Sequence, residues 1–222
     1  NDIVSAAKLF DLKFTNKEVD TMYAGIKENI TVYKNMHQTN LSNSIPMSNW
    51  QSPMVPGLQI NTKQNKIKWS FNKNLTLPTN RADLAFYSVA DLSVLIKTKK
   101  ISALELTQFF IDRIKQYGDS LQCVISITES IALEQAKAAD AELASGKYRG
   151  PLHGIPYGLK DLFAVNGTKT TWGAAPYKDQ VIAEDAYVYN RLKEAGAILV
   201  AKFTLGSLAM GDYWFGGRTK NP

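Results

Sequence analysis

Residues 197–202, AILVAK, form an apolar run without polar alternation that ends in a lysine. Such a run is typical of a strand in a parallel sheet that is covered on both faces. Two further apolar segments, LQCVISI at 121–127 and IPYGLKDLF at 155–163, come before it, and helical patterns separate the three. This alternation predicts an α/β fold with a mostly parallel sheet covered by helices.

Capping patterns indicate where the helices begin. Thr15 with Glu18, and Ser102 with Glu105, each have the spacing of a capping box. The sequence also predicts a cap at Thr128 for an alanine-rich helix that ends at Gly146. A further helix is predicted over 184–195, with two acidic residues in its first turn.

The chain divides into two parts by its pattern. We expect residues 1–81 to be an N-terminal extension, helical to about residue 37 and then a linker or strap rich in Asn, Ser, Gln and Pro. Trp50 and Trp69 are predicted to be isolated apolar anchors in that strap. Residues 82–222 are predicted to form the main α/β domain. The arm could cover a site, pair two subunits as a homodimer, or only pack on the main domain.

Composition excludes some classes of protein. The net charge of +6 and a pI of about 9.2 are moderately basic, but the lysines are scattered and form no nucleic-acid module, so we expect no nucleic-acid partner. No apolar stretch has the length of a membrane span. The single Cys123 is expected to be a small core residue, and no metal site is predicted. The chain starts at Asn1, so an initiator segment is expected to have been removed or left out of the sequence. The location, whether secreted, periplasmic or cytoplasmic, stays open.

Five separated segments together resemble the amidase signature family. They are, in the order in which the family has them, SALELTQFFIDRI at 102–114, GPLHGIPYGLKDLF at 150–163, TKTTWGA at 168–174, RLKEAGAILVAK at 191–202 and FGGRTKNP at 215–222. The resemblance implies the N-terminal part of an amidase signature fold. It also implies hydrolysis or transfer of amide bonds by a Ser-Ser-Lys triad, without metal or organic cofactor.

Lys160 matches the catalytic lysine of the family's KD pair, so the resemblance implies that it is the general base. A free lysine has a pKa near 10.4, and burial among apolar groups lowers the pKa of a lysine, which suits a base. The sequence predicts an apolar shell around this lysine, formed by Ile155, Tyr157, Leu159, Leu162 and Phe163. Asp161 is expected to point to the other face of the strand.

The resemblance places both catalytic serines after Pro222, beyond the 222 residues. Ser207 is expected to be a helix residue instead of a nucleophile, and His153 a structural imidazole. In the family the stretch after the AK strand runs along the active site, so Met210, Gly211 and Asp212 are candidate substrate-binding residues. Asp212 departs from the family's Met-Gly-Ser pattern; it could hold a cationic substrate or cap a turn.

The leading hypothesis is therefore an amidase that hydrolyses a carboxamide C–N bond of a small-molecule or peptide substrate. One alternative is the catalytic subunit of a tRNA-dependent amidotransferase, which shares these motifs. The other alternative is a non-catalytic α/β module in which Lys160 is structural.

Overall fold

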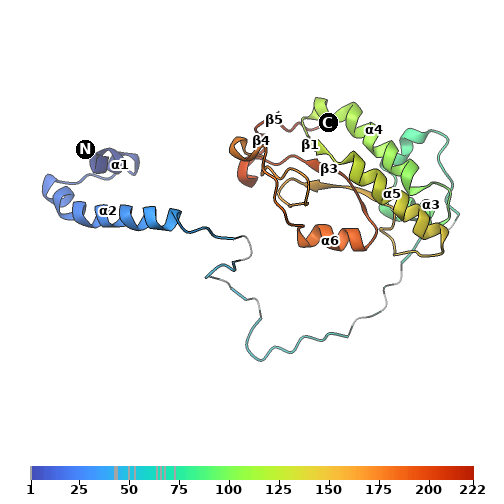
Figure 1. The fold of residues 1–222 in the computed structure, drawn as a ribbon, viewed down its shortest axis with the longest axis horizontal. Coiled ribbons are helices and arrows are strands. Elements are labelled where there is room, and N and C mark those ends of the chain that lie inside the picture. The colour runs from blue at the N-terminus through green and yellow to red at the C-terminus, as the bar shows by residue number, and fades with distance from the viewer. Residues whose placement is uncertain are drawn as a thin grey trace. The chain divides into compact units, whose positions relative to one another are not determined.

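The structure of the protein is a computed structural model that describes residues 2–42, 45–49, 51–52, 54–63, 65, 67, 69–72 and 74–222. The chain separates into two compact units, residues 1–65 and 66–222, and Figure 1 shows the ribbon of each. Trp50, a predicted anchor, lies outside the described residues, whereas Trp69 stacks on Phe71 with ring centroids 6.2 Å apart.

The described residues of the first unit form the helices α1 (Asp2–Leu9) and α2 (Asn16–His37). The predicted capping box at the start of α2 is confirmed, because the Thr15 side chain accepts from the Glu18 amide and the Glu18 carboxylate accepts from the Thr15 amide. Among the helices that the structure describes, none is long and apolar enough to cross a membrane.

The second unit alternates helices and strands, which confirms the predicted α/β class. Its elements, in chain order, are η1 (Arg81–Phe86), α3 (Val89–Lys97), α4 (Ala103–Leu121), β1 (Val124–Ile127), α5 (Glu129–Ala144), β2 (Pro156–Lys160), η2 (Ala175–Tyr177), α6 (Tyr187–Glu194), β3 (Ile198–Phe203), η3 (Ser207–Ala209), β4 (Tyr213–Trp214) and β5 (Gly217–Arg218). The three η elements are short 3₁₀ turns.

The main sheet has the strand order β1-β3-β2, so the AILVAK run forms the central strand. β2 and β3 are parallel, with Tyr157 opposite Leu199 and Leu159 opposite Lys202. β1 runs antiparallel to β3. The sheet is therefore mixed instead of mostly parallel, because an apolar run indicates burial on both faces but does not encode the direction of the neighbouring strand.

Helices cover both faces of the sheet, and Figure 1 shows α4 and α5 on one side of β3 and α6 on the other. Ile198 and Val200 of β3 pack in a core with residues of α4 and α5. Leu199, which alternates with them, packs with Leu159 and with Tyr189 of α6. This alternation buries β3 from Ile198 to Lys202 and explains why its sequence has no polar residue before Lys202.

Two predicted helix starts were wrong in detail. Thr128 precedes α5 but makes no capping hydrogen bond; its hydroxyl donates to the Leu199 carbonyl instead, at 2.8 Å. Asp185 lies before α6 and not in its first turn, and its carboxylate accepts from the Asn166 amide. In both cases the side chain forms a hydrogen bond with a residue distant in sequence, and not with the first turn of the helix as the local pattern predicted.

An ion-pair cluster links α5 to the end of α6 through Arg149. Glu142 accepts from the Arg149 guanidinium at 2.6 Å and from Lys147 at 2.7 Å. Arg149 also donates to the carbonyls of Lys193 and Glu194 at the end of α6. These hydrogen bonds, led by those from Arg149, lower the pKa of Glu142 from 4.5 to about 2.

A carboxyl group whose pKa is depressed by folding stabilises the fold above its unfolded pKa and loses that contribution as pH falls towards its folded pKa. We expect Glu142→Gln to lower the melting temperature at pH 7, and the gap to wild type to shrink between about pH 5 and pH 2. Thermal unfolding followed by circular dichroism measures this. Glu134→Gln, an exposed position on the same helix, is the control. A gap that stays constant over this range would contradict the assignment.

Candidate functional site

Lys160 is the last residue of β2 and is exposed. It pairs in register with Phe203, so both side chains leave the sheet on the same face. The predicted apolar shell is wrong for the described residues: Ile155 and Leu159 are buried, but Leu162 and Phe163 are 42% and 37% exposed. The reason is that Lys160 ends an edge strand, where only the alternate residue Leu159 faces the core.

The buried lysine of this region is Lys202 at the end of β3. It forms an ion pair with Asp161, Nζ to Oδ1 at 2.9 Å, and both side chains are 0% exposed. Asp161 thus points away from Lys160, as the strand alternation predicted. A buried charge pair is tolerated only where further hydrogen bonds complete it.

Those hydrogen bonds come from one loop, residues 169–171. The second carboxylate oxygen of Asp161 accepts from the Thr171 amide at 2.8 Å and from the Thr171 hydroxyl. The Lys202 ammonium donates to the Lys169 carbonyl at 3.0 Å and to the Thr170 hydroxyl at 3.3 Å. The loop 169–171 is therefore bound both by the Asp161 carboxylate and by the Lys202 ammonium group.

The residues that follow this loop are hydrogen-bonded to the segment that carries the candidate substrate-binding residues. The Trp172 amide donates to the Asp161 carbonyl at 3.3 Å, and the Leu208 amide donates to the Trp172 carbonyl at 2.8 Å. The Phe215 amide donates to the Gly173 carbonyl at 3.1 Å. A continuous set of hydrogen bonds thus runs from the end of β2 to the segment 205–215.

Backbone strain collects along this connection. Trp172, Leu208 and Ala209 have φ angles of 51°, 52° and 68°, in the left-handed region that side chains rarely adopt. A Cβ on Gly173 would lie 2.2 Å from the Leu205 carbonyl oxygen, so only glycine fits this close approach. Strained residues of this kind persist where the surrounding structure holds them, and they are common at functional sites.

The candidate substrate-binding residues follow η3 on an exposed turn. Met210 is 78% exposed, and Gly211 has a φ of 66°. Asp212 accepts from the Arg218 guanidinium at 2.6 Å, across the β4–β5 hairpin. Its charge is therefore balanced within the chain. The part of these residues in substrate binding stays a prediction.

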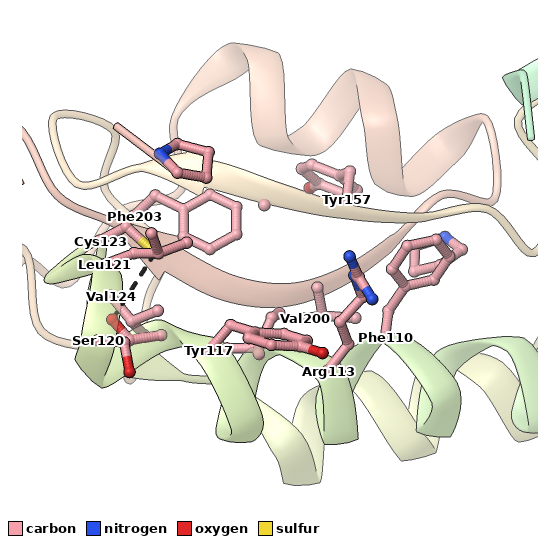
Figure 2. A pocket seen from close by; sticks show the side chains of 15 residues that line it. Phe110, Arg113, Tyr117, Ser120, Leu121, Cys123, Val124, Tyr157, Val200 and Phe203 are labelled. Atoms are coloured by element: carbon pink, nitrogen blue, oxygen red, sulfur yellow. Dashed lines mark hydrogen bonds between the residues drawn. The ribbon is translucent and has the colours of Figure 1, made fainter. Parts of the chain in front are cut away.

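An apolar cavity of about 690 Å³ lies between α4 and the sheet. Figure 2 shows Phe110, Arg113 and Tyr117 of α4 facing Val200 and Phe203 of β3. Tyr157 of β2 also lines the cavity, although its ring packs with Leu199 and Tyr189. The Arg113 guanidinium stacks on the Tyr117 ring, 4.9 Å from its centroid. Burial raises the pKa of Tyr157, with Tyr189 adding to the shift. Lys160 does not line this cavity, although it lies on the same face of the sheet.

Other chemically interesting side chains have structural environments. His153 is buried; its Nδ1 accepts from the Arg149 amide at 3.4 Å and its Nε2 lies 2.9 Å from the Ala139 carbonyl, which Nε2–H can donate to. Ser207 begins the exposed turn η3 and not a strand-to-helix elbow. Burial raises the pKa of the Cys123 thiol. Over the part of the chain that the structure describes, no group of three or more His, Cys, Asp or Glu could hold a metal ion.

Sequence reasoning missed Lys202, Thr170 and Thr171. A signal was present, since an apolar run as long as AILVA must be buried, and a lysine that ends it needs a nearby anion. Asp161 was the available carboxylate, because it follows β2 directly. The distance along the sequence between these residues hid the pairing.

A family model described as Amidase matches residues 105–222. A curated relative, the A subunit of glutamyl-tRNA(Gln) amidotransferase from Coxiella burnetii (strain Dugway 5J108-111), is 43% identical over 138 residues, which are 61% of this chain and 28% of the relative. The protein of the same name from Azoarcus sp. (strain BH72) is 42% identical over 125 residues, 56% of this chain and 26% of that protein.

Solved amidase structures are also similar. The native peptide amidase from Stenotrophomonas maltophilia is 32% identical, with a TM-score of 0.59 over 62% of this chain and 30% of that chain. A complex of the peptide amidase PAM with chymostatin is 34% identical, with a TM-score of 0.58 over the same shares. The chain thus spans less than a third of the length of these proteins.

The two lysines at the strand ends should differ in their effect on stability. Lys202→Met leaves the Asp161 carboxylate buried without its cation, so we expect the free energy of unfolding to fall by about 3–5 kcal/mol. Lys160→Met removes an exposed charge, and we expect a change within about 0.5 kcal/mol. Urea denaturation of both variants measures the difference. Equal effects would contradict the burial of Lys202.

Proposed function

This chain belongs to the amidase family, and from that premise we propose that it is part of an amidase that hydrolyses a carboxamide C–N bond. Lys160 is the proposed general base. The observation that carries the proposal is an exposed lysine at the end of β2 that forms no ion pair among the described residues. Its neighbour Asp161 is connected through Trp172 to the strained segment 205–215 by backbone hydrogen bonds.

The charge environment of Lys160 supports this role. No ion pair joins Lys160 to any carboxylate in the described part of the chain, because its neighbour Asp161 is engaged by Lys202. A lysine serves as a base only when its neutral form is accessible, and a close carboxylate would hold the ammonium form. The pair of Asp161 and Lys202 therefore leaves Lys160 free of such a partner.

In the proposed mechanism Lys160 takes a proton from a serine relay, and a second serine attacks the amide carbonyl carbon. The C–N bond then breaks and the amine leaves with a proton, giving an acyl-enzyme ester that water hydrolyses to the acid. The family resemblance places both serines after Pro222. We propose that the apolar cover that Lys160 lacks here comes from the larger part of the relatives' length that this chain does not match.

Lys160→Ala tests the proposed base in the full-length protein that contains this chain. We expect kcat for ammonia release from C-terminally amidated peptides to fall by about a hundredfold or more, as loss of general-base catalysis predicts. The melting temperature should stay near that of wild type, because the side chain is exposed. Lys178→Ala, another exposed lysine of the same unit, is the matched control. Near-normal turnover by Lys160→Ala would refute the proposal.

A second candidate function is that of the catalytic component of a tRNA-dependent amidotransferase, and the 43% identity to a protein of that kind favours it. The two candidates differ in their need for partners. If the protein is an amidase, we expect the purified polypeptide to release ammonia from simple carboxamides by itself. Activity only with glutamine, and only after other subunits are added, would favour the amidotransferase instead.

A further inference from the structure

The pair of Asp161 and Lys202 does more than fill the interior. Replacing a buried ion pair with apolar side chains of similar size often leaves stability unchanged or increases it. Stability alone therefore does not require two charges that are both 0% exposed. What the charges do provide is a fixed position for the loop 169–171, because each charge forms a hydrogen bond with a specific backbone atom of that loop.

The position of the ion pair indicates why a fixed loop matters, because the pair lies next to Lys160. Asp161 directly follows Lys160, and its amide donates to the Phe203 carbonyl at 2.8 Å while its carbonyl accepts from Trp172. Its backbone is therefore attached to β3 on one side and to the loop on the other. Trp172, the residue after the loop, in turn accepts from the Leu208 amide through its carbonyl. The end of β2 is thus connected to the segment 205–215 through Asp161, Trp172 and Leu208.

We propose that Asp161, Lys202 and Thr171 are positioning residues, which hold Lys160 in place against the segment 205–215. This inference rests on the proposed function, because it assigns the three residues to the same amide hydrolysis. None of the three is a base or nucleophile. Their role is to keep the β2 end and the strained turn in one arrangement, since an error of about 1 Å in such an arrangement can cost about a hundredfold in rate.

The decisive variant is the double substitution Asp161→Leu/Lys202→Met. It removes both charges together, so neither is left buried and unpaired. We expect a folded protein with a melting temperature close to that of wild type, and a kcat lower by about a hundredfold with KM changed less than about threefold. A double variant that folds and keeps wild-type kcat would overturn the proposal.

A milder variant covers the case in which the double variant fails to fold. Thr171→Val removes only the hydroxyl that donates to Asp161, and we expect kcat to fall by about tenfold. Thr171→Ser restores the hydroxyl and should restore kcat. Thr107→Val is the matched control, because Thr107 is also 0% exposed but its hydroxyl has no hydrogen-bond partner. Equal losses of kcat in the two valine variants would overturn the proposal.

Hydrogen exchange separates this proposal from the proposed function. The amides of Thr171, Trp172 and Leu208 belong to the connection, and we expect them to exchange at least about tenfold faster in the double variant, whether or not the protein is an amidase. Unchanged exchange together with an inactive Lys160→Ala variant would overturn the positioning role alone. Faster exchange with a fully active Lys160→Ala variant would overturn the proposed function and the catalytic purpose of the positioning.

Discussion

The ion pair between Asp161 and Lys202 is the interaction on which this region of the protein depends. Two charges without exposure to water are costly, and the cost is met here by hydrogen bonds from a single loop. As a result, the ends of β2 and β3 and the loop 169–171 share one set of contacts.

This arrangement also explains the state of Lys160. Lys160 ends β2, and Lys202 is the last but one residue of the neighbouring parallel strand β3. Among the described residues, Asp161 is the carboxylate that forms an ion pair with one of them. Lys202 takes that carboxylate because it faces the same side of the sheet, whereas Lys160 faces the other side with Phe203. The result is one lysine in the interior that is ion-paired with Asp161, and one that is exposed and forms no ion pair among the residues described. The latter is the more suitable of the two for proton transfer.

The strained backbone beyond the loop fits the same account. Left-handed φ angles at Trp172, Leu208 and Ala209 need surroundings that hold them. The hydrogen bonds from Asp161 through Trp172 to Leu208 supply part of that support. The family match covers this whole region, since it extends over residues 105–222. The first unit, residues 1–65, lies outside that match.

The sequence by itself determined the α/β class, the family and two capping boxes, of which Ser102 with Glu105 at the start of α4 is present as predicted, like the one at Thr15. These depend on local spacing and on motifs read in order. It also placed Lys160 at a strand end and predicted that Asp161 would face away from it. Only the tertiary structure decided which lysine is buried, the direction of β1 and the partners of Thr128 and Asp185. Each of these depends on atoms brought together from distant parts of the chain: Lys202 lies 41 positions after Asp161 in the sequence, yet 2.9 Å from it in space.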